Sequence, residues 1–195
     1  MRLAVVGISK GPRENLLKRL AFIFQQLHPD RVVYLSRHPI AQALGEPFEG
    51  VDFWERAAAV APQGTSEQIL KLVAERAIWQ RAKQIESLAE NGIATDMLKC
   101  GFVQIVESKK TLSKDDMTSS SVVVFGNSPR PVIQRLGNRL LVAPGPSSRP
   151  DGGMVLLSDS RKGTHVQLFD PSGRCVRSAT LVSSSAQAQL TVKGD

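Results

Sequence analysis

The stretch from residue 122 to residue 146 constrains the fold of this 195-residue chain more than any other part. It opens with three valines and Phe125, an apolar run rich in β-branched side chains that predicts a short buried strand. Gly126 ends that strand and begins a turn, and a second apolar run ends in the turn Pro144-Gly145-Pro146. Because open α/β sheets bind ligands where strands end in such turns, we expect a site at this edge.

The first 35 residues predict a strand, a helix and a second strand in succession. The apolar run before Gly7 and the run from Arg31 to Leu35 are typical of buried strands, and Gly11-Pro12 opens the helix between them. The apolar residues of this helix recur at helical spacing: Leu16, Leu17, Leu20, Phe24 and Leu27. Such a unit makes two parallel strands with a right-handed crossover, so the sequence indicates an α/β protein.

A long helix is predicted between Thr65, which begins a capping-box pattern, and Gly92. Residues 66–90 contain neither Gly nor Pro and carry apolar residues at helical spacing, so we expect a helix broken at most once. Trp79 lies within it. Two interpretations remain open: Trp79 is an exposed contact for a protein partner or a second copy, or it belongs to a stripe that packs on the core.

The rest of the chain predicts further strands and a short helix. Residues 93–98 and 102–106 predict a β-hairpin, and Ser113 begins a short helix. After residue 153, three apolar or alternating runs separated by turns predict an antiparallel meander. We expect a single domain over residues 1–195, in which residues 183–195 form either a frayed tail or an edge strand.

The composition argues against several classes of protein. The two cysteines are too few for a disulfide scaffold, the N-terminal apolar run is too short for a secretory signal, and no run approaches the roughly 18 apolar residues of a membrane span. We therefore expect a cytoplasmic protein without a membrane anchor. The net charge of +7 gathers in residues 1–40 and 130–177, which indicates an acidic partner, an anionic ligand or only a solvated surface. Aromatic residues make up 5% and do not alternate with the basic ones, so we do not expect nucleic-acid binding.

The two turns of the opening stretch resemble those of the calcineurin-like metallophosphoesterases. In that family one strand ends in Gly-His-Thr-His followed by a basic residue and Pro, and a later strand ends in Asn-Pro-Gly-Ser. The corresponding sequences here are Gly126-Asn127-Ser128-Pro129-Arg130-Pro131 and Ala143-Pro144-Gly145-Pro146. The resemblance covers nearly the whole chain and implies an α/β fold in which two sheets lie between helix layers, an α/β/β/α sandwich.

The resemblance also implies that the metal ligands of the family are missing. Their positions fall on residues without carboxylate or imidazole groups: Ile8, Lys10, Ser36-Arg37, Asn127 and Pro129. Glu107 follows the strand that ends in a further histidine in the family, and we expect it to pair with Lys109 or Lys110. A two-metal phosphoesterase needs clustered carboxylates and imidazoles. We therefore expect no metal, no cofactor and no catalysis, but a protein-binding or scaffold role, like that of the retromer subunit of this family, with a protein partner or a homo-oligomer.

An alternative function follows from the cations at the same strand ends. Lys10, Arg37 and Arg130, together with Asn127 and Ser128, predict a weak site for a phosphate-containing or other anionic small molecule. The chain would then be a metal-independent enzyme or sensor that binds its ligand in the Lys10/Arg37 cleft. The same cations are equally expected in a site that has lost its function and drifted.

Overall fold

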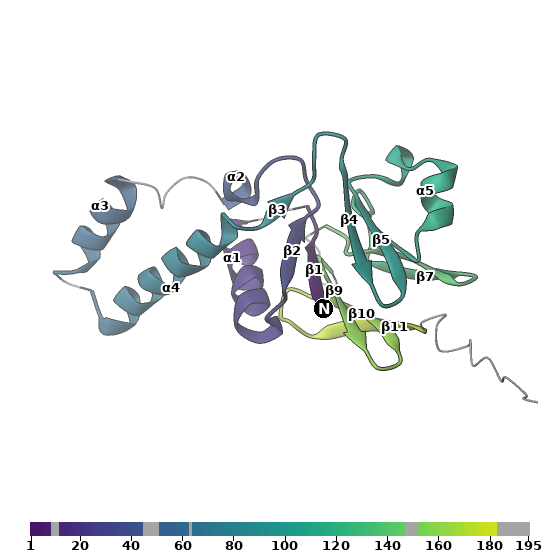
Figure 1. Cartoon of the computed structure of the whole chain (residues 1–195). Coiled ribbons are helices and arrows are strands. Elements are labelled where there is room, and N and C mark those ends of the chain that lie inside the picture. The colour runs from purple at the N-terminus through teal and green to yellow at the C-terminus, as the bar shows by residue number, and fades with distance from the viewer. Residues whose placement is uncertain (9–11, 45–50, 63, 147–151, 183–195) are drawn as a thin grey trace, which may run out of the picture.

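Two β-sheets lie face to face between helices in the computed structural model, which describes residues 1–8, 12–44, 51–62, 64–146 and 152–182 (Figure 1). The first sheet has the strand order β11 (Cys175–Val182), β10 (Gly163–Phe169), β9 (Met154–Ser160), β1 (Arg2–Val6), β2 (Arg31–Tyr34), β3 (Glu86–Ser87). The second has the order β4 (Ile93–Leu98), β5 (Gly101–Val106), β6 (Val122–Phe125), β8 (Arg139–Ala143), β7 (Val132–Leu136). The predicted α/β/β/α sandwich is confirmed.

The predicted strand–helix–strand unit forms the centre of the first sheet. Strand β1 pairs in parallel with β2 and antiparallel with β9, as the register of Leu3 with Arg31 and with Leu157 shows. Helix α1 (Arg13–Phe22) begins directly after Pro12 and continues as a π-helical turn over Ile23–Leu27. His28 ends it in the left-handed conformation, with φ of 43°.

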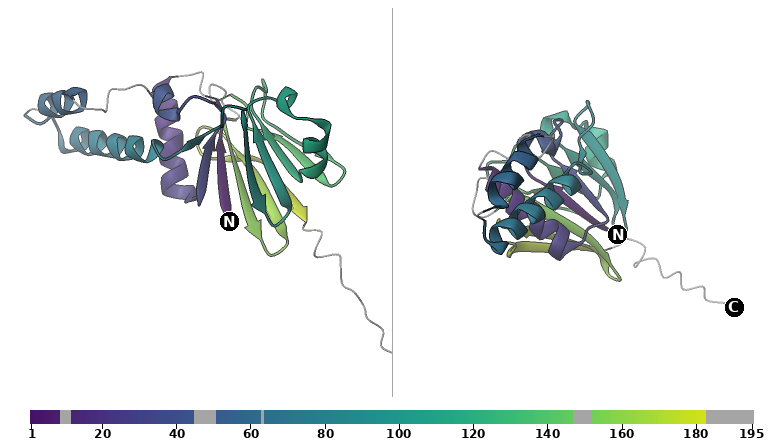
Figure 2. Two further views of the ribbon diagram at one scale, coloured as in Figure 1. Left: turned by 45° about the horizontal axis from the view of Figure 1, so that its top comes forward. Right: turned by 90° about the vertical axis from the view of Figure 1, so that its left-hand side faces the viewer.

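Alternating side chains of β1 divide the core into two layers. Leu3 and Val5 pack between the two sheets, whereas Ala4 and Val6 pack against the helices. This alternation explains why the strand reads as a continuous apolar run, since both of its faces are buried. Figure 2 shows the result, with α1 on one side of the paired sheets and α5 (Lys114–Ser119) on the other.

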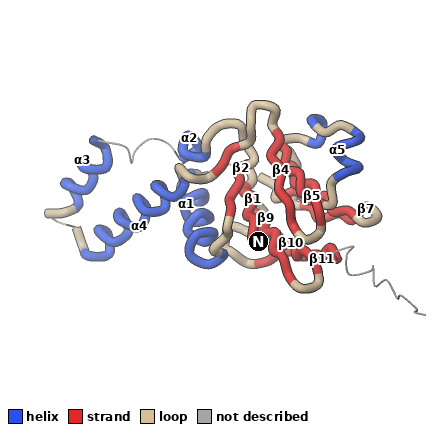
Figure 3. The backbone as a smooth tube through the Cα atoms, in the orientation of Figure 1, coloured by secondary structure: helices blue, strands red, loops and turns tan. Residues whose placement is uncertain are grey.

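A helical arm projects from this body. It consists of α3 (Val51–Val60) and α4 (Ser66–Ala82), and it follows the short helix α2 (Ile40–Leu44). Figure 3 shows the arm in blue, extending away from the red strands of the two sheets. Thr65 caps α4 with a capping box, as predicted, because its side chain accepts from the Gln68 amide and the Gln68 side chain accepts from the Thr65 amide.

Two predictions of secondary structure need correction. The helix predicted over residues 66–90 ends at Ala82, and the chain then turns into β3, which pairs in parallel with β2 and lets Ile85 and Leu88 be buried. Strand β7 was not predicted, although it forms an antiparallel hairpin with β8. The β4–β5 hairpin, the helix that begins after Ser113 and the C-terminal meander are confirmed.

Two further predictions concern the C-terminal residues and membrane-spanning helices. Residues 183–195, predicted as a tail or an edge strand, lie outside the described residues. Among the helices that the structure describes, none combines the length and apolar character needed to cross a membrane.

Candidate functional site

A small pocket lies where β1, β6 and β8 end, at the edge predicted from the two turns. Its volume is about 260 Å³, and it is lined by Ile8, Gly126, Asn127, Ser128, Pro129, Gly145 and Pro146. Asn127, two residues after the end of β6, adopts the left-handed conformation, with φ of 50°. Gly7 allows the strand ends to approach, because a Cβ at this position would lie 2.4 Å from the Gly145 carbonyl oxygen. The two turns therefore form a pocket, which we call the rim pocket.

The wall of the rim pocket next to β1 is aliphatic. Ile8 stands where the resemblance places a metal-binding aspartate, and its Cδ1 lies 3.5 Å from the position that a Cβ on Gly126 would take. The side chain packs on the core between the two sheets. An aliphatic group in this place offers neither charge nor a lone pair to a cation.

Two of the predicted site residues, Asn127 and Ser128, do line the rim pocket. The Ser128 hydroxyl donates a hydrogen bond of 2.7 Å to the Arg130 carbonyl oxygen, so the turn already uses it. Arg130 is exposed and its side chain is not part of the lining. Among the described residues that line the pocket there is no histidine or carboxylate to act as a general base for the serine.

Arg37 forms an ion pair that the sequence did not predict. Its Nε donates to Glu107 Oε2 at 2.9 Å, across the ends of β2 and β5. Glu107 was expected to pair with Lys109 or Lys110, but the Lys109 ammonium lies 4.0 Å from the centre of the Phe125 ring. The pair balances the charge of Arg37 and leaves less of it for an anion.

The structure describes only two of the three cations of the predicted cluster, so the cluster stays a prediction. Arg37 is paired with Glu107, and Arg130 does not line the pocket. Lys10, the third member, lies outside the described residues. Of the two residues that named the predicted cleft, the described one, Arg37, forms an ion pair and does not line the rim pocket.

Trp79 is a core residue, which corrects its interpretation as a partner contact. Only 2% of its surface is exposed, and it packs in the apolar cluster between α4, α1 and the first sheet. The Lys83 ammonium lies 4.1 Å from the ring centre. The large apolar residues that α4 exposes are Ile69, Leu70 and Val73. Ile69 and Val73 belong to the apolar stripe expected to pack on the core, and their exposure corrects that part of the prediction.

The rim residues do not fit the metal pair that the fold family implies. Ile8 and Pro129 offer no ligand atom, Ser128 is hydrogen bonded within its turn, and Arg37 is a cation. Over the described ranges, no three His, Cys, Asp or Glu side chains lie together in an arrangement for a metal ion. What the rim pocket offers chemically is neutral hydrogen bonding by Asn127 and by backbone groups.

Comparison with known proteins places the fold. No family model and no curated protein matches the sequence. Among solved structures, a single mutant of Vps29 from Entamoeba histolytica matches with a TM-score of 0.52 and 9% identity, over 92% of this chain and 99% of that one. GAP50, described as the anchor in the inner membrane complex of Plasmodium, matches with a TM-score of 0.53 and 7% identity, over 94% of this chain and 89% of that one.

The chain has the fold of the calcineurin-like metallophosphoesterases. A predicted phosphoesterase from Streptococcus pneumoniae is also similar, with a TM-score of 0.49 and 10% identity over 92% of this chain and 98% of that one. At such identities the similarity extends to the fold and not to the activity. The function has to be argued from the residues of this chain.

Proposed function

We propose that the chain is a protein-binding or scaffold module that uses a metallophosphoesterase fold without hydrolysing phosphoesters. The main observation behind the proposal is the type of side chain at the ends of the strands. Where the resemblance places carboxylate and imidazole ligands, this chain has the aliphatic Ile8 and the ion pair of Arg37 with Glu107. Glu107 is the one carboxylate at these positions, and one carboxylate held by an arginine does not make a site for two cations.

Two observations support the protein-binding part of the proposal. The GAP50 structure shows a protein of this fold that is described as an anchor. In addition, Trp54, Ile69, Leu70 and Val73 are exposed together on the α3–α4 arm, and exposed apolar groups on a projecting element are typical of an interaction site. Both cysteines are free, in keeping with the reducing cytoplasm that we propose as the location.

The absence of hydrolysis is tested by metal titration and assay. Purified protein is incubated with manganese or zinc, freed of unbound metal and analysed for metal content, and then assayed with a generic aryl phosphodiester. We expect no stoichiometric metal, no turnover above buffer and no change of the melting temperature on addition of a chelator. Two bound metal equivalents together with turnover would refute the proposal, and a catalytically active phosphoesterase treated in the same way is the control.

A second function, a metal-independent enzyme or sensor of a phosphate-containing or other anionic ligand, rests on the rim pocket itself. Its turn offers Asn127 and backbone groups, and its volume of about 260 Å³ is enough for a small anion. The Arg37–Glu107 pair argues against it, because one of the predicted cations is already paired with a carboxylate. The Discussion gives a phosphate titration that separates the two functions.

A further inference from the structure

The outer face of α4 carries an uncharged stripe. The stripe consists of five exposed residues spaced by four and three positions in turn: Ser66, Leu70, Val73, Ala77 and Gln80. Leu70 is 68% exposed and Val73 is 56% exposed, and none of the described elements covers them. Spacing of this kind places residues along one seam of a coiled coil. We call these five residues the α4 seam.

The opposite face of α4 already packs on the protein. Leu72, Trp79 and Ala82 are buried on that face. Because α4 thus has apolar residues on two opposite sides, with Leu70, Val73 and Ala77 on the outer one, packing within one chain buries only one side. Covering a second exposed apolar surface of a helix with another apolar surface is favourable, because it removes apolar groups from water.

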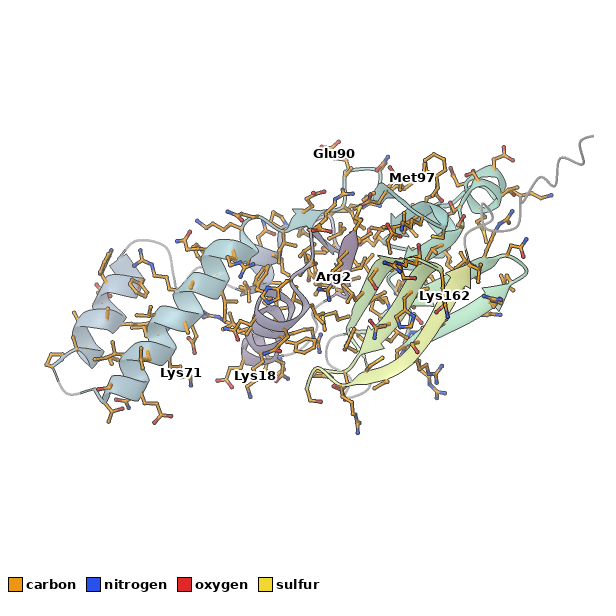
Figure 4. All side chains as sticks on the ribbon, turned by 60° about the horizontal axis from the view of Figure 1, so that its bottom comes forward. Arg2, Lys18, Lys71, Glu90, Met97 and Lys162 are labelled. Carbon is orange, nitrogen blue, oxygen red and sulfur yellow. The ribbon has the colours of Figure 1, made fainter. Side chains whose placement is uncertain are left out.

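Charged flanks border the α4 seam on both sides. Toward α1 lies a groove with Lys71 and Lys18 on its two walls (Figure 4). Toward α3, the Arg76 guanidinium lies 4.1 Å from the centre of the Phe53 ring and 5.0 Å from that of Trp54. An uncharged strip between charged borders is the pattern of a helix that packs against another helix.

We propose that the α4 seam binds the same seam of a second copy of this chain, with the two helices antiparallel. The inference deepens the proposed function, since it names one partner of the binding module. A two-fold axis across the middle of α4 makes the contact self-complementary. If one residue of the first copy contacts a certain residue of the second, the same contact recurs with the two copies exchanged. Placed near residue 75, the axis brings Val73 opposite Ala77 of the second copy and Leu70 opposite Gln80.

The charges beside the α4 seam select the antiparallel arrangement. Glu67, Ala74 and Arg81 follow one flank at intervals of seven residues. In an antiparallel pair this flank faces its own copy, so Glu67 lies near Arg81 of the second copy at both ends. A parallel pair would instead keep Glu67 and Arg81 of the two copies at opposite ends of the contact, so that no such pair forms. Arg76 opposes neither arrangement, because its stacking on Phe53 turns it toward α3. The Arg81 guanidinium lies 4.2 Å from the centre of the Phe24 ring of its own chain, and pairing with Glu67 of the second copy replaces that contact.

The size of the α4 seam sets the strength of the contact. A helix of 17 residues is about 25 Å long and about 10 Å wide, so the seam offers a few hundred Å² per protomer. Stable interfaces bury about 800 Å² per partner. The dimer is therefore weak and reversible, with a dissociation constant on the order of tens of micromolar.

Sedimentation equilibrium of the full chain tests the proposal at protein concentrations up to about 500 µM, well above that constant. We expect the wild-type mass to rise from monomer toward dimer. Leu70→Glu with Val73→Glu should weaken association more than tenfold while the circular dichroism spectrum stays unchanged. Met97→Glu with Phe102→Glu is the matched control, because these two residues are similarly exposed but lie on the β4–β5 hairpin. The control variant should associate like the wild type.

A charge exchange tests the orientation. Glu67→Arg alone should weaken the dimer, and Glu67→Arg combined with Arg81→Glu should restore it. A wild type that stays monomeric at the highest concentration, or a hairpin variant that loses association as fully as the seam variant, overturns the dimer. A double exchange that fails to restore association overturns the antiparallel arrangement. None of these outcomes bears on the metal and phosphodiester assays, so the proposed function and the dimer can fail separately.

Discussion

Two substitutions on opposite faces of α4 should have opposite effects on stability and association. Trp79 is 2% exposed and packs among the helices, whereas Leu70 is 68% exposed on the α4 seam. Replacing a buried aromatic residue by alanine removes its apolar contacts and leaves a cavity, which costs about 3–5 kcal/mol. For Trp79→Ala the contact with Lys83 is lost as well, at a cost of about 0.5–1 kcal/mol.

Leu70→Ala removes an exposed side chain and leaves no cavity. Alanine is at least as good a helix former as leucine, so we expect a change of less than about 0.5 kcal/mol. In a domain of this size 1 kcal/mol corresponds to about 2–4 °C in melting temperature, so Trp79→Ala should lower it by about 10 °C and Leu70→Ala by less than 2 °C. Association should change in the reverse order, because only Leu70 belongs to the α4 seam.

Urea denaturation followed by circular dichroism measures the free energies, and fluorescence reports the burial directly. The chain has two tryptophans, of which Trp54 is 62% exposed. A Trp54→Phe variant should retain a blue-shifted emission that iodide quenches poorly, and a Trp79→Phe variant should show the reverse. If Trp79→Ala costs less than about 1 kcal/mol, or if iodide quenches Trp79 as efficiently as Trp54, the assignment of the two faces is wrong.

Three further predictions concern the rim and the first sheet. Because Glu107 neutralises Arg37, phosphate should stabilise the wild type in a thermal-shift assay no more than chloride does at equal ionic strength. In the Glu107→Gln variant, phosphate at several times its Kd should raise the free energy of unfolding by about 1 kcal/mol more than chloride does. A phosphate-specific stabilisation of the wild type would favour the anion-binding function. Gly7→Ala should lose about 1–3 kcal/mol in urea denaturation, because its Cβ would lie 2.4 Å from the Gly145 carbonyl oxygen, and an unchanged stability would contradict this packing. Burial raises the pKa of the Asp170 carboxyl, but hydrogen bonds from Ser172 and Arg174 outweigh it and hold that pKa below its usual range. The stability that Asp170 contributes should therefore be complete above the unfolded pKa and be lost as the pH falls through the folded one, and urea denaturation from neutral to acidic pH should show a smaller loss for Asp170→Asn.

The sheets could be predicted because their strands carry local signals. The apolar runs of β1, β2, β6 and β8 are short and rich in valine and leucine, all but β2 end at Gly or Pro, and each lies where it was predicted. Strand β7 had a signal too, since Gly137-Asn138 separates it from β8 in the manner of a two-residue hairpin turn. The strand was missed because its exposed residues Gln134 and Arg135 are polar, and an edge strand with one face in solvent lacks the apolar run that predicts a buried strand.

The two faces of α4 could not be told apart from the sequence. Leu72 and Trp79 form one helical stripe, and Leu70, Val73 and Ala77 form another, and both are apolar. Which stripe is buried depends on how α1 and the first sheet meet the helix, and a helical pattern does not contain that information. The pairing of Arg37 with Glu107 is likewise a long-range contact, 70 residues apart, that competes with the local lysines considered from sequence.

The rim explains why the fold was easier to predict than the function. Gly7 is required because β1 ends against the Gly145 turn, and Gly126 is required because a Cβ there would lie 2.8 Å from the Glu107 carbonyl oxygen. These close approaches arise because the ends of both sheets meet there, so both positions require glycine whatever lines the pocket. Ile8 is under no such backbone constraint on its side-chain type, whereas the left-handed conformation of Asn127 favours Asn or Gly there. Glycines that such close approaches require therefore indicate the architecture, whereas the function depends on the other side chains of the site.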